Sequence, residues 1–387
     1  MCRKILTAES VCEGHPDKLC DLIADTILDE CLCNDPYSRV ACEVLATHGK
    51  IVVAGEITTD SPVDYVEVVK NTLNAVGYNV SDYKIEIAIH EQSPDINGGV
   101  TKDDGSLGAG DQGVVYGYAC NETNSLLPLP VVLANAITKT LDDMRHEGII
   151  EGIKPDGKCL VSVEYEDDEP TRITDVVISV QHDEKLSIEE LECIIRSQVL
   201  PVVFKHYPVD AKTRILVNPS GRFVVGGPEA DTGLTGRKLM CDTYGGLARH
   251  GGGAFSGKDA TKVDRSAAYF ARYVAKHIVA CEFARRCEVC ITYAIGKAEP
   301  VAIDIDTFGT GIFENDELLE AVMCAFDFTP RGIIEQLQLR QPLFKHTTRY
   351  GHFTNQALPF EQLNKVDDLL GFMIFGKEYE SNDNSKN

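Results

Sequence analysis

The feature that most constrains the fold of this chain is an order of helix, strand hairpin and helix that recurs three times. Hairpins of two alternating strands begin near residues 39, 158 and 287, so their starts lie 119 and 129 residues apart. Apolar residues at helical spacing precede and follow each hairpin. A similar element order at a similar spacing predicts an internal threefold repeat of an α+β unit, although this order is common enough to recur by chance.

The repeat predicts six helices and six strands in a chain whose 387 residues suit two or three domains. Each unit is expected to be a sheet with helices on one face. The expected helices span residues 17–33, 63–76, 130–146, 187–204, 264–286 and 315–326, and the expected strands span residues 39–47, 51–58, 158–166, 171–181, 287–295 and 301–307.

Charge is distributed unevenly along the chain. The 60 acidic residues outnumber the 37 Lys and Arg, which leaves a net charge of −23 and argues against a general binder of nucleic acid. Residues 237–276 instead hold eight Lys or Arg against three acids, a net charge of +5 that leaves −28 for the remainder. This basic island predicts a small, highly charged anion as the ligand.

Composition narrows the class of protein. A 43% apolar content predicts a full core, and the absence of any run of 18 apolar residues argues against a membrane span, so we expect no association with a membrane. The first ten residues lack the pattern of a secretion signal, so we expect a cytoplasmic protein with reduced thiols. Residues 31–33 and 287–290 carry closely spaced cysteine pairs, but two matching knuckles are usual for structural zinc. Small buried hydrophobes are the better interpretation.

Two segments lack the periodicity of a helix or strand. Residues 92–112 are rich in glycine and turn residues, and a loop of this length inside a compact protein is typical of a lid or a linker. The flanking glycines favour a lid. Residues 377–387 are polar and are expected to be a disordered tail.

Glu13-Gly-His-Pro-Asp-Lys18 stands where the first helix is expected to begin. Pro16 suits the first helical position, which places Asp17 in the first turn and His15 just before it. A helix N-terminus attracts phosphate, and a neighbouring carboxylate suits Mg²⁺ that is also bound by substrate phosphates. The alternative is that Asp17 only complements the helix dipole and that His15 is a turn residue.

Residues 252–259, Gly-Gly-Ala-Phe-Ser-Gly-Lys-Asp, nearly match the phosphate-binding P-loop pattern. Asp259 replaces the hydroxyl residue that would bind Mg²⁺, and no apolar strand precedes the segment, so a true P-loop is rejected. The glycine-rich backbone with Lys258, Lys262 and Arg265 still suits a polyphosphate. The alternative is a flexible loop with solvated lysines.

Residues 218–228, Asn-Pro-Ser-Gly-Arg-Phe-Val-Val-Gly-Gly-Pro, follow a strand and place Phe223 beside Arg222. An aromatic ring in this position suits stacking on a nucleotide base or burial in the core. The residues alone favour the core.

Taken together, these segments resemble the S-adenosylmethionine synthetase family from about Lys4 to Phe360. The motifs at residues 13–18, 218–223 and 251–259 carry the resemblance, as do Gly-Ala-Gly-Asp-Gln-Gly, Thr-Gly-Arg-Lys and Tyr-Gly-His-Phe at residues 108–113, 235–238 and 350–353. The departures from the family pattern are Ala260 in place of proline, Phe360 in place of tryptophan, and Gly98-Gly99 with a short stretch after it. They bear on loop dynamics and kinetics.

The resemblance implies three similar α/β domains around a pseudo-threefold axis, at residues 1–101, 110–229 and 231–370, with a gate loop at residues 92–108. It also implies a homodimer or homotetramer with active sites between subunits. The implied reaction is synthesis of S-adenosylmethionine by in-line attack of the sulfur of L-methionine on the ribose 5′ carbon of ATP. Hydrolysis of the tripolyphosphate to phosphate and diphosphate follows.

The resemblance also implies roles for particular residues. The implied catalytic residues are His15, Lys158, Arg237, Lys238, Lys258 and Lys262. The implied ATP-binding residues are His15, Asp156, Lys158, Arg222, Phe223, Asp231, Arg237, Lys238, Ala254 and Lys258. The implied methionine-binding residues are Glu56, Gln92, Asp111, Asp231 and Lys262, and the implied metal ligands are Asp17 and Asp264 for two Mg²⁺ and Glu43 for one K⁺.

Two other functions fit part of the sequence. A P-loop kinase is argued against by Asp259. A nucleotide-binding regulatory subunit without catalysis is argued against by five residues that are present together, since drift is expected to lose some of them: His15, Asp17, Lys258, Lys262 and Asp264.

Overall fold

The computed structural model describes residues 3–91, 107–207 and 209–373. Gln92, most of the predicted gate loop and the predicted tail lie outside the described residues. Among the helices that are described, none is long and apolar enough to cross a membrane.

The predicted threefold repeat of α+β units is confirmed. Each unit holds a helix, an antiparallel hairpin and a second helix, in that order. The units are α1 (Pro16–Asn34), β2 (Arg39–Thr47), β3 (Lys50–Thr58) and α2 (Tyr65–Val76), then α4 (Leu129–His146), β6 (Ile153–Glu166), β7 (Glu169–His182) and α5 (Ile188–Ile194), and finally α8 (Val263–Ala280), β10 (Arg286–Tyr293), β11 (Ala302–Asp306) and α9 (Asn315–Ala325).

Further strands extend the hairpins into sheets, and short helices complete the chain. The further strands are β1 (Arg3–Val11), β4 (Lys84–His90), β5 (Gly113–Cys120), β8 (Arg214–Val217) and β9 (Gly233–Leu234). The short helices are α6 (Leu200–Val203), α7 (Leu239–Asp242) and α10 (Pro330–Gln336), with short 3₁₀ segments at Val80–Asp82, Gly227–Glu229, Phe344–His346 and Pro359–Glu361.

The three sheets exchange strands in a cycle. Their strand orders are β9-β2-β3-β4, β1-β6-β7-β8 and β5-β10-β11. In each sheet, the first strand of the hairpin pairs antiparallel with a strand from another part of the chain: β2 with β9, β6 with β1 and β10 with β5. Thus β1 leaves the first unit for the second sheet, β5 precedes the second unit but joins the third sheet, and β9 precedes the third unit but joins the first. The sheets therefore do not follow simple sequence ranges, and the domain boundaries stay a prediction.

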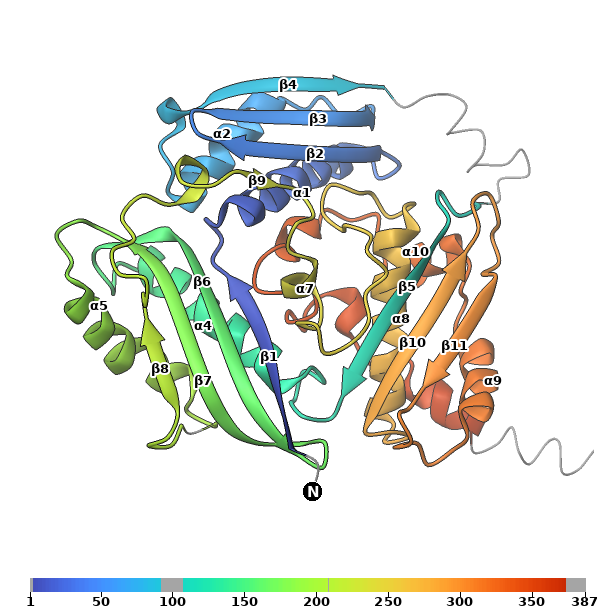
Figure 1. Ribbon diagram of the computed structural model, residues 1–387. Helices are drawn as coiled ribbons and strands as arrows, with labels where there is room; N and C mark the ends of the chain where they lie inside the picture. The colour runs from blue at the N-terminus through green and yellow to red at the C-terminus, as the bar shows by residue number, and fades with distance from the viewer. Residues whose placement is uncertain (1–2, 92–106, 208, 374–387) are drawn as a thin grey trace, which may run out of the picture.

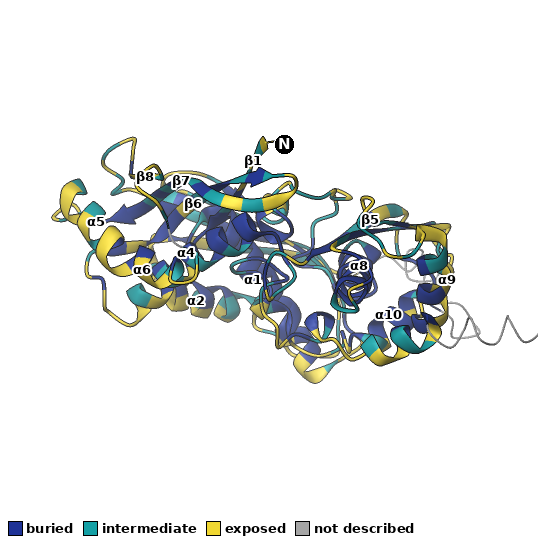
Figure 2. Ribbon diagram, turned by 90° about the horizontal axis from the view of Figure 1, so that it is seen from below, coloured by how far each residue is buried: buried dark blue, intermediate teal, exposed yellow. Residues whose placement is uncertain are grey.

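The sheets and helices form two layers. The sheets surround a common centre in Figure 1, and the side view in Figure 2 shows strands on one side with helices α1, α4 and α8 beneath them. One apolar core joins the first and third units, from Leu19 and Val53 to Phe270 and Val289. A second core fills the space between α4 and the sheet of β6 and β7.

Two of the predicted helices are wrong in part. The predicted helix 264–286 ends at Ala280 because Glu282 adopts a left-handed conformation (φ 58°) and Arg286 already pairs with Cys120 of β5. The predicted helix 187–204 is divided by a π-helical segment, Ile195–Val199. The amide-free Pro201 follows this segment and cannot continue the regular hydrogen-bond ladder, which explains the change of helix type.

Candidate active site

The first functional element is the N-terminus of α1, which begins at Pro16 as predicted. His15 caps this helix, since its Nδ1 accepts a hydrogen bond of 3.2 Å from the backbone amide of Asp17. An imidazole nitrogen that accepts a hydrogen bond carries no proton, so the proton of the neutral ring lies on Nε2. The cap thereby fixes both the orientation and the tautomer of His15.

Asp17 lies on the same turn and is held by β9 and by the segment after it. The Nζ atom of Lys238 donates to one carboxylate oxygen at 2.6 Å, and the amide of Leu234 donates to the other at 3.0 Å. Burial alone raises the pKa of Asp17, but these hydrogen bonds and the charge of Lys238 outweigh it and hold the pKa below its usual value. Asp17 is therefore a carboxylate at neutral pH.

His15 is uncharged at neutral pH. Burial, together with the charges of Lys238 and Lys158, lowers its pKa to about 4 against the opposing effect of Asp17. We define the α1 cluster as His15, Asp17, Lys158, Arg237 and Lys238. Lys238 and Lys158 lie near an uncharged imidazole, whose Nε2–H group has no hydrogen-bond partner among the described residues.

The other cations of the α1 cluster are also held in place. The Nζ atom of Lys158 on β6 lies 2.6 Å from the carboxylate of Glu9 on β1. The Nε atom of Arg237 lies 3.7 Å from Asp17, and half of its side chain is exposed. Both β1 and β9 are strands exchanged between units, so the exchange is what assembles this cluster.

The predicted nucleotide residues lie on separate segments, and Asp156 is near Lys238 of the α1 cluster. Asp156 accepts a hydrogen bond of 2.7 Å from the amide of Gly227, and burial together with the nearby Asp231 raises its pKa to about 6 against the opposing charge of Lys238. Phe223 exchanges two hydrogen bonds with His182 at the end of β7. Its ring is half-buried and is not part of either apolar core, contrary to what the residues alone favoured.

The exposed Arg222 beside it forms an ion pair of 2.5 Å with Glu184. This pair leaves the Arg222 side chain at the protein surface, on the same segment as the half-buried ring.

The second functional element is the glycine-rich loop, which is bonded to β2. The amide of Cys42 donates to the carbonyl of Gly257, the amide of Asp259 donates to the carbonyl of Val40, and the Asp259 carboxylate accepts from the Val40 amide at 2.7 Å. This is not the geometry of a P-loop, because the loop runs beside a strand instead of joining a strand to a helix.

Lys258 and Asp264 form an ion pair of 2.6 Å at the end of this loop. Glu43 on β2 is nearby: burial raises its pKa, and the charge of Lys258 opposes that effect. Lys262 pairs with Asp259. We define the loop cluster as Glu43, Lys258, Lys262 and Asp264.

Two glycines allow this packing. A Cβ atom on Gly253 would lie 2.5 Å from the carboxyl carbon of Asp264. Gly257 has a φ of +79°, and a Cβ atom there would lie 1.9 Å from the carbonyl oxygen of Cys42. Side chains at either position would push the loop away from the groups that it positions.

The two clusters are close but separate. Ala254 faces Gly236, where a Cβ atom would lie 2.4 Å from the Cβ of Ala254. Across residues 3–91, 107–207 and 209–373, no hydrogen bond or ion pair joins a member of one cluster to a member of the other.

The predicted methionine residues are less closely grouped. Glu56 lies on β3 with a contact of 3.2 Å to His90 on the neighbouring β4. Asp111 is exposed just before β5, and Gln92 lies outside the described residues.

Not every cation of the basic island at residues 237–276 is placed to bind an anion. Arg265 is fully buried and makes two hydrogen bonds of 2.6 Å with Asp25. Arg272 and Lys276 are also buried, and both bind the buried Glu361. An unpaired charge is too costly to bury, so these cations are balanced by distant acids. Arg265 therefore supports the fold and does not face a polyphosphate.

Metal binding was predicted at Asp17, Asp264 and Glu43. Among the described residues, no group of three or more His, Cys, Asp or Glu is placed to hold a metal ion. Asp17 and Asp264 fit a different kind of site, because Mg²⁺ is commonly bound by one or two carboxylates while substrate phosphates and water complete its shell. Each lies beside a lysine able to bind the same phosphates.

Sequence reasoning missed the support beneath His15. Glu13 is buried and is held by Arg145 at 2.5 Å, by Arg349 at 2.7 Å and by His146. Three basic partners from α4 and from the chain after α10 fix the residue two positions before His15. Glu13 belongs to the motif that was identified, but nothing in the local sequence indicates its partners.

One prediction concerns the ionisation of His15. Replacing Lys238 with Met is expected to raise the pKa of His15 from about 4 toward its usual value, because a neighbouring positive charge is removed. The ring proton resonances of selectively labelled histidine, followed by NMR as pH is lowered, measure this pKa. Lys50→Met is the matched control, since Lys50 also pairs with a carboxylate at 2.7 Å but lies on β3. An unchanged His15 pKa in Lys238→Met would contradict the charge assignment.

Comparisons with known proteins identify the family of this chain. Models of the N-terminal, central and C-terminal domains of S-adenosylmethionine synthetase match residues 3–94, 106–223 and 225–362. The S-adenosylmethionine synthase of Clostridium botulinum (strain Alaska E43 / Type E3) is 48% identical over 390 residues, which cover 96% of this chain and 100% of that protein.

Proposed function

Because this chain belongs to the S-adenosylmethionine synthetase family, we propose that it synthesises S-adenosylmethionine from ATP and L-methionine. The observation that carries the proposal is the pair of clusters around His15 and Lys258, in which lysines accompany single carboxylates. Such an arrangement suits a substrate that combines a chain of phosphates with bound cations.

The chemistry explains why lysines dominate. The sulfur of methionine is a nucleophile without deprotonation, so its in-line attack on the ribose 5′ carbon needs no general base. The difficulty lies in the tripolyphosphate, which gathers negative charge as the carbon–oxygen bond breaks. Cations of the α1 and loop clusters placed around these oxygens stabilise the transition state more than the ground state.

His15 has a specific part in this scheme. Its Nδ1 is occupied by the amide of Asp17, so the Nε2–H group is the one available to the substrate. A neutral imidazole donates this hydrogen bond to the 5′ oxygen of the leaving tripolyphosphate. The lowered pKa keeps the ring in that form throughout the physiological range.

Asp17 and Asp264 are the proposed Mg²⁺ ligands, and Glu43 is the proposed K⁺ ligand. Bound Mg²⁺ neutralises phosphate charge and polarises the bonds to phosphorus. In this structure Lys238 neutralises Asp17 and Lys258 neutralises Asp264. We infer that both pairs open when substrate binds, which would leave the carboxylates free to hold the cations and the lysines free to contact the phosphates. The same lysines hold the tripolyphosphate during its hydrolysis to phosphate and diphosphate.

The remaining assignments concern substrate recognition. Phe223 is proposed to stack on the adenine, with Arg222, Asp156 and Asp231 beside it. Ala254 and Arg237 are proposed to contact ATP, and Glu56, Gln92, Asp111 and Lys262 are proposed to contact methionine.

The reaction is tested by incubating the protein with ATP, methionine, Mg²⁺ and K⁺. We expect S-adenosylmethionine, phosphate and diphosphate in equal amounts, measured by chromatography and mass spectrometry. Absence of S-adenosylmethionine with a correctly folded, assembled protein would overturn the proposal. Omission of methionine controls for simple ATP hydrolysis.

We further propose that the α1 cluster of one subunit and the loop cluster of its partner form each active site of a homodimer. The absence of any polar contact between the two clusters of one chain, within its described residues, supports this arrangement.

Mixing subunits tests the arrangement. After denaturation and refolding together, His15→Ala and Lys258→Ala chains are expected to recover up to about one quarter of the parent activity, because half of the dimers are mixed and each mixed dimer has one intact site. Each variant refolded alone is the control. If mixing restores no activity although mixed dimers form, both clusters act within one chain.

A further inference from the structure

Tyr78 lies directly after α2, and the proposed reaction gives it no role. Gly77 ends this helix in a left-handed conformation (φ 103°), and its amide donates to the carbonyl of Asn74. The amide of Tyr78 donates to the carbonyl of Leu73 at 2.9 Å, which completes a Schellman motif. The half-buried ring packs edge-on against Tyr83, with 6.4 Å between the ring centroids. The helix end and the ring packing together fix the position of the Tyr78 hydroxyl.

The hydroxyl of Tyr78 reaches the backbone that leads into α1. It donates a hydrogen bond of 2.5 Å to the carbonyl oxygen of Gly14, the residue before His15. The amide of His15 in turn bonds to the carbonyl of Cys12 at 3.1 Å. We define the His15 turn as residues 12–15. Tyr78 is therefore bonded directly to the turn that carries the proposed catalytic imidazole.

The same hydroxyl lies against Gly227. A Cβ atom on Gly227 would lie 2.2 Å from the hydroxyl oxygen, so this approach requires glycine. The amide of Gly227 donates to Asp156, which places the Tyr78 hydroxyl between the His15 turn and the backbone that binds Asp156. Burial and the nearby Asp156 raise the pKa of Tyr78 above its usual value, so the hydroxyl keeps the proton that it donates. Tyr78 thus joins two segments that are both assigned to ATP.

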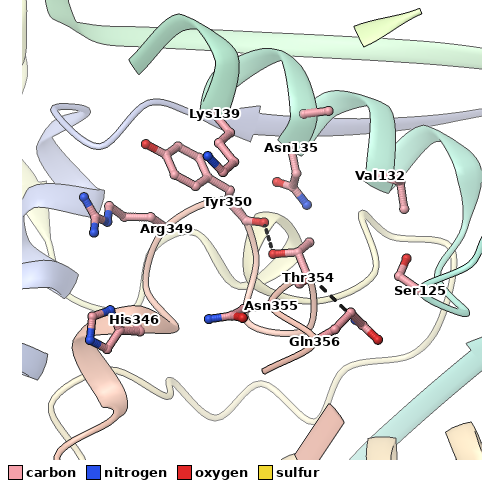
Figure 3. A pocket seen from close by; sticks show the side chains of 11 residues that line it. Ser125, Val132, Asn135, Lys139, His346, Arg349, Tyr350, Thr354, Asn355 and Gln356 are labelled. Carbon is pink, nitrogen blue, oxygen red and sulfur yellow. Dashed lines mark hydrogen bonds between the residues drawn. The ribbon is translucent and has the colours of Figure 1, made fainter. Parts of the chain in front are cut away.

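Other bonds hold the His15 turn to α4. The amide of Glu13 donates to Asp142 on α4 at 2.9 Å, and Asp142 also accepts a hydrogen bond of 3.0 Å from the hydroxyl of Tyr350. Figure 3 shows Tyr350 on the segment after α10, where it lines a cavity beside α4. These bonds fix the His15 turn to α4 but do not involve Gly227, whereas the Tyr78 hydroxyl contacts both.

We propose that Tyr78 is a positioning residue of the ATP site, whose hydroxyl sets the spacing between the His15 turn and the segment of Gly227. This role rests on the proposed function, in which His15 contacts the 5′ oxygen of ATP and Asp156 contacts the nucleotide. Both contacts are made to one substrate molecule, so a change in the spacing misplaces one contact when the other is formed. Tyr78 acts through these neighbours and has no part in binding methionine.

Tyr78→Phe removes the hydroxyl and keeps the ring. It is expected to lower kcat about tenfold and to raise the KM for ATP about three- to tenfold, because loss of one hydrogen bond lets the two segments shift. The KM for methionine should change by less than about twofold, since no methionine contact depends on this spacing. Steady-state kinetics with each substrate varied in turn measures these constants. A parent-like kcat and KM for ATP, or an equal rise in both KM values, would overturn the proposal.

Tyr83→Phe is the matched control. Tyr83 packs against Tyr78 and is 8% exposed, and within the described structure its hydroxyl makes no hydrogen bond. Both variants therefore lose one hydroxyl from the same pair of rings, but the His15 turn loses a contact in Tyr78→Phe alone. The same kinetic changes in Tyr83→Phe would show a general loosening of the packing after α2 and would refute a positioning role.

Amide hydrogen exchange separates this role from the proposed reaction, because it needs no turnover. The amide of Asp17 bonds to His15, and the amide of Gly227 bonds to Asp156. Both amides should exchange at least about threefold faster in Tyr78→Phe than in the parent or in Tyr83→Phe, while the Cys42 amide on β2 should not change. Faster exchange supports the link even if the parent makes no S-adenosylmethionine, a result that would refute the proposed reaction alone. Unchanged exchange at both amides would refute the link, whatever the parent catalyses.

Discussion

Replacement of Lys258 by alanine is expected to lower kcat for S-adenosylmethionine synthesis by about 10²–10³, with only a small change in the KM for methionine. The proposed partner of this ammonium group is the tripolyphosphate, whose charge develops as the bond to carbon breaks. Loss of an interaction that forms mainly in the transition state lowers kcat and leaves ground-state binding of methionine nearly unchanged.

The structure predicts that this substitution leaves the fold intact. The backbone at Lys258 is fixed by Gly257 and Asp259, which bond to β2, and by its own carbonyl, which accepts from Arg265 at 3.1 Å. None of these bonds involves the Lys258 side chain. Circular dichroism and the oligomeric state of the variant should therefore match those of the parent.

Steady-state kinetics with methionine varied at saturating ATP, Mg²⁺ and K⁺ gives both constants. Lys365→Ala is the matched control. Lys365 is also paired with an aspartate, Asp368, at 2.7 Å, but it belongs to neither the α1 cluster nor the loop cluster. A parent-like kcat for Lys258→Ala would remove Lys258 from the catalytic assignment. A large rise in KM alone would assign it to methionine binding.

The elements with local signals were predictable from the sequence. The strand 39–47 coincides with β2, and the helix after Glu13-Gly-His begins at Pro16 because proline both suits the first turn and excludes the residues before it. These features depend on residues within a few positions of each other. The family resemblance then added roles for His15 and Lys258 that no periodicity indicates.

The exchanged strands were not predicted. Of these strands, β9 is only two residues long and has no pattern of its own. It exists because Leu45 and Ala46 offer an open edge to Gly233 and Leu234. That pairing depends on residues almost 190 positions apart, and it brings Lys238 to Asp17.

The net positive charge of residues 237–276 overstated the number of cations at the site, because partners distant in the sequence balance some of them. A count of charges along the sequence treats Arg265 and Lys258 alike, although one is fully buried and the other is partly exposed at the proposed site. The difference is set by Asp25 on α1, about 240 residues earlier in the chain. Local charge predicts an anion site only for cations that are not balanced by a distant acid.

Replacement of Arg265 by methionine is expected to destabilise the protein by about 3–5 kcal/mol, a large part of the total stability of a typical protein. Arg265 and Asp25 are both fully buried, and their bidentate pair joins α8 to α1. Without the guanidinium, Asp25 remains a buried carboxylate with the amide of Gly257 as its main partner. Urea unfolding at fixed protein concentration measures the loss.

Two further variants separate the buried charge from other effects. Arg214→Met is the control, because Arg214 is mostly exposed and its ion pair with Asp175 is worth at most about 1 kcal/mol. The double variant Arg265→Met, Asp25→Asn removes both charges while an amide oxygen can still accept from Gly257. It should recover much of the lost stability, since the main cost in the single variant is an uncompensated charge. If the double variant is less stable than Arg265→Met alone, the hydrogen bonds made by the Asp25 carboxylate, and not its unbalanced charge, decide the stability of this core.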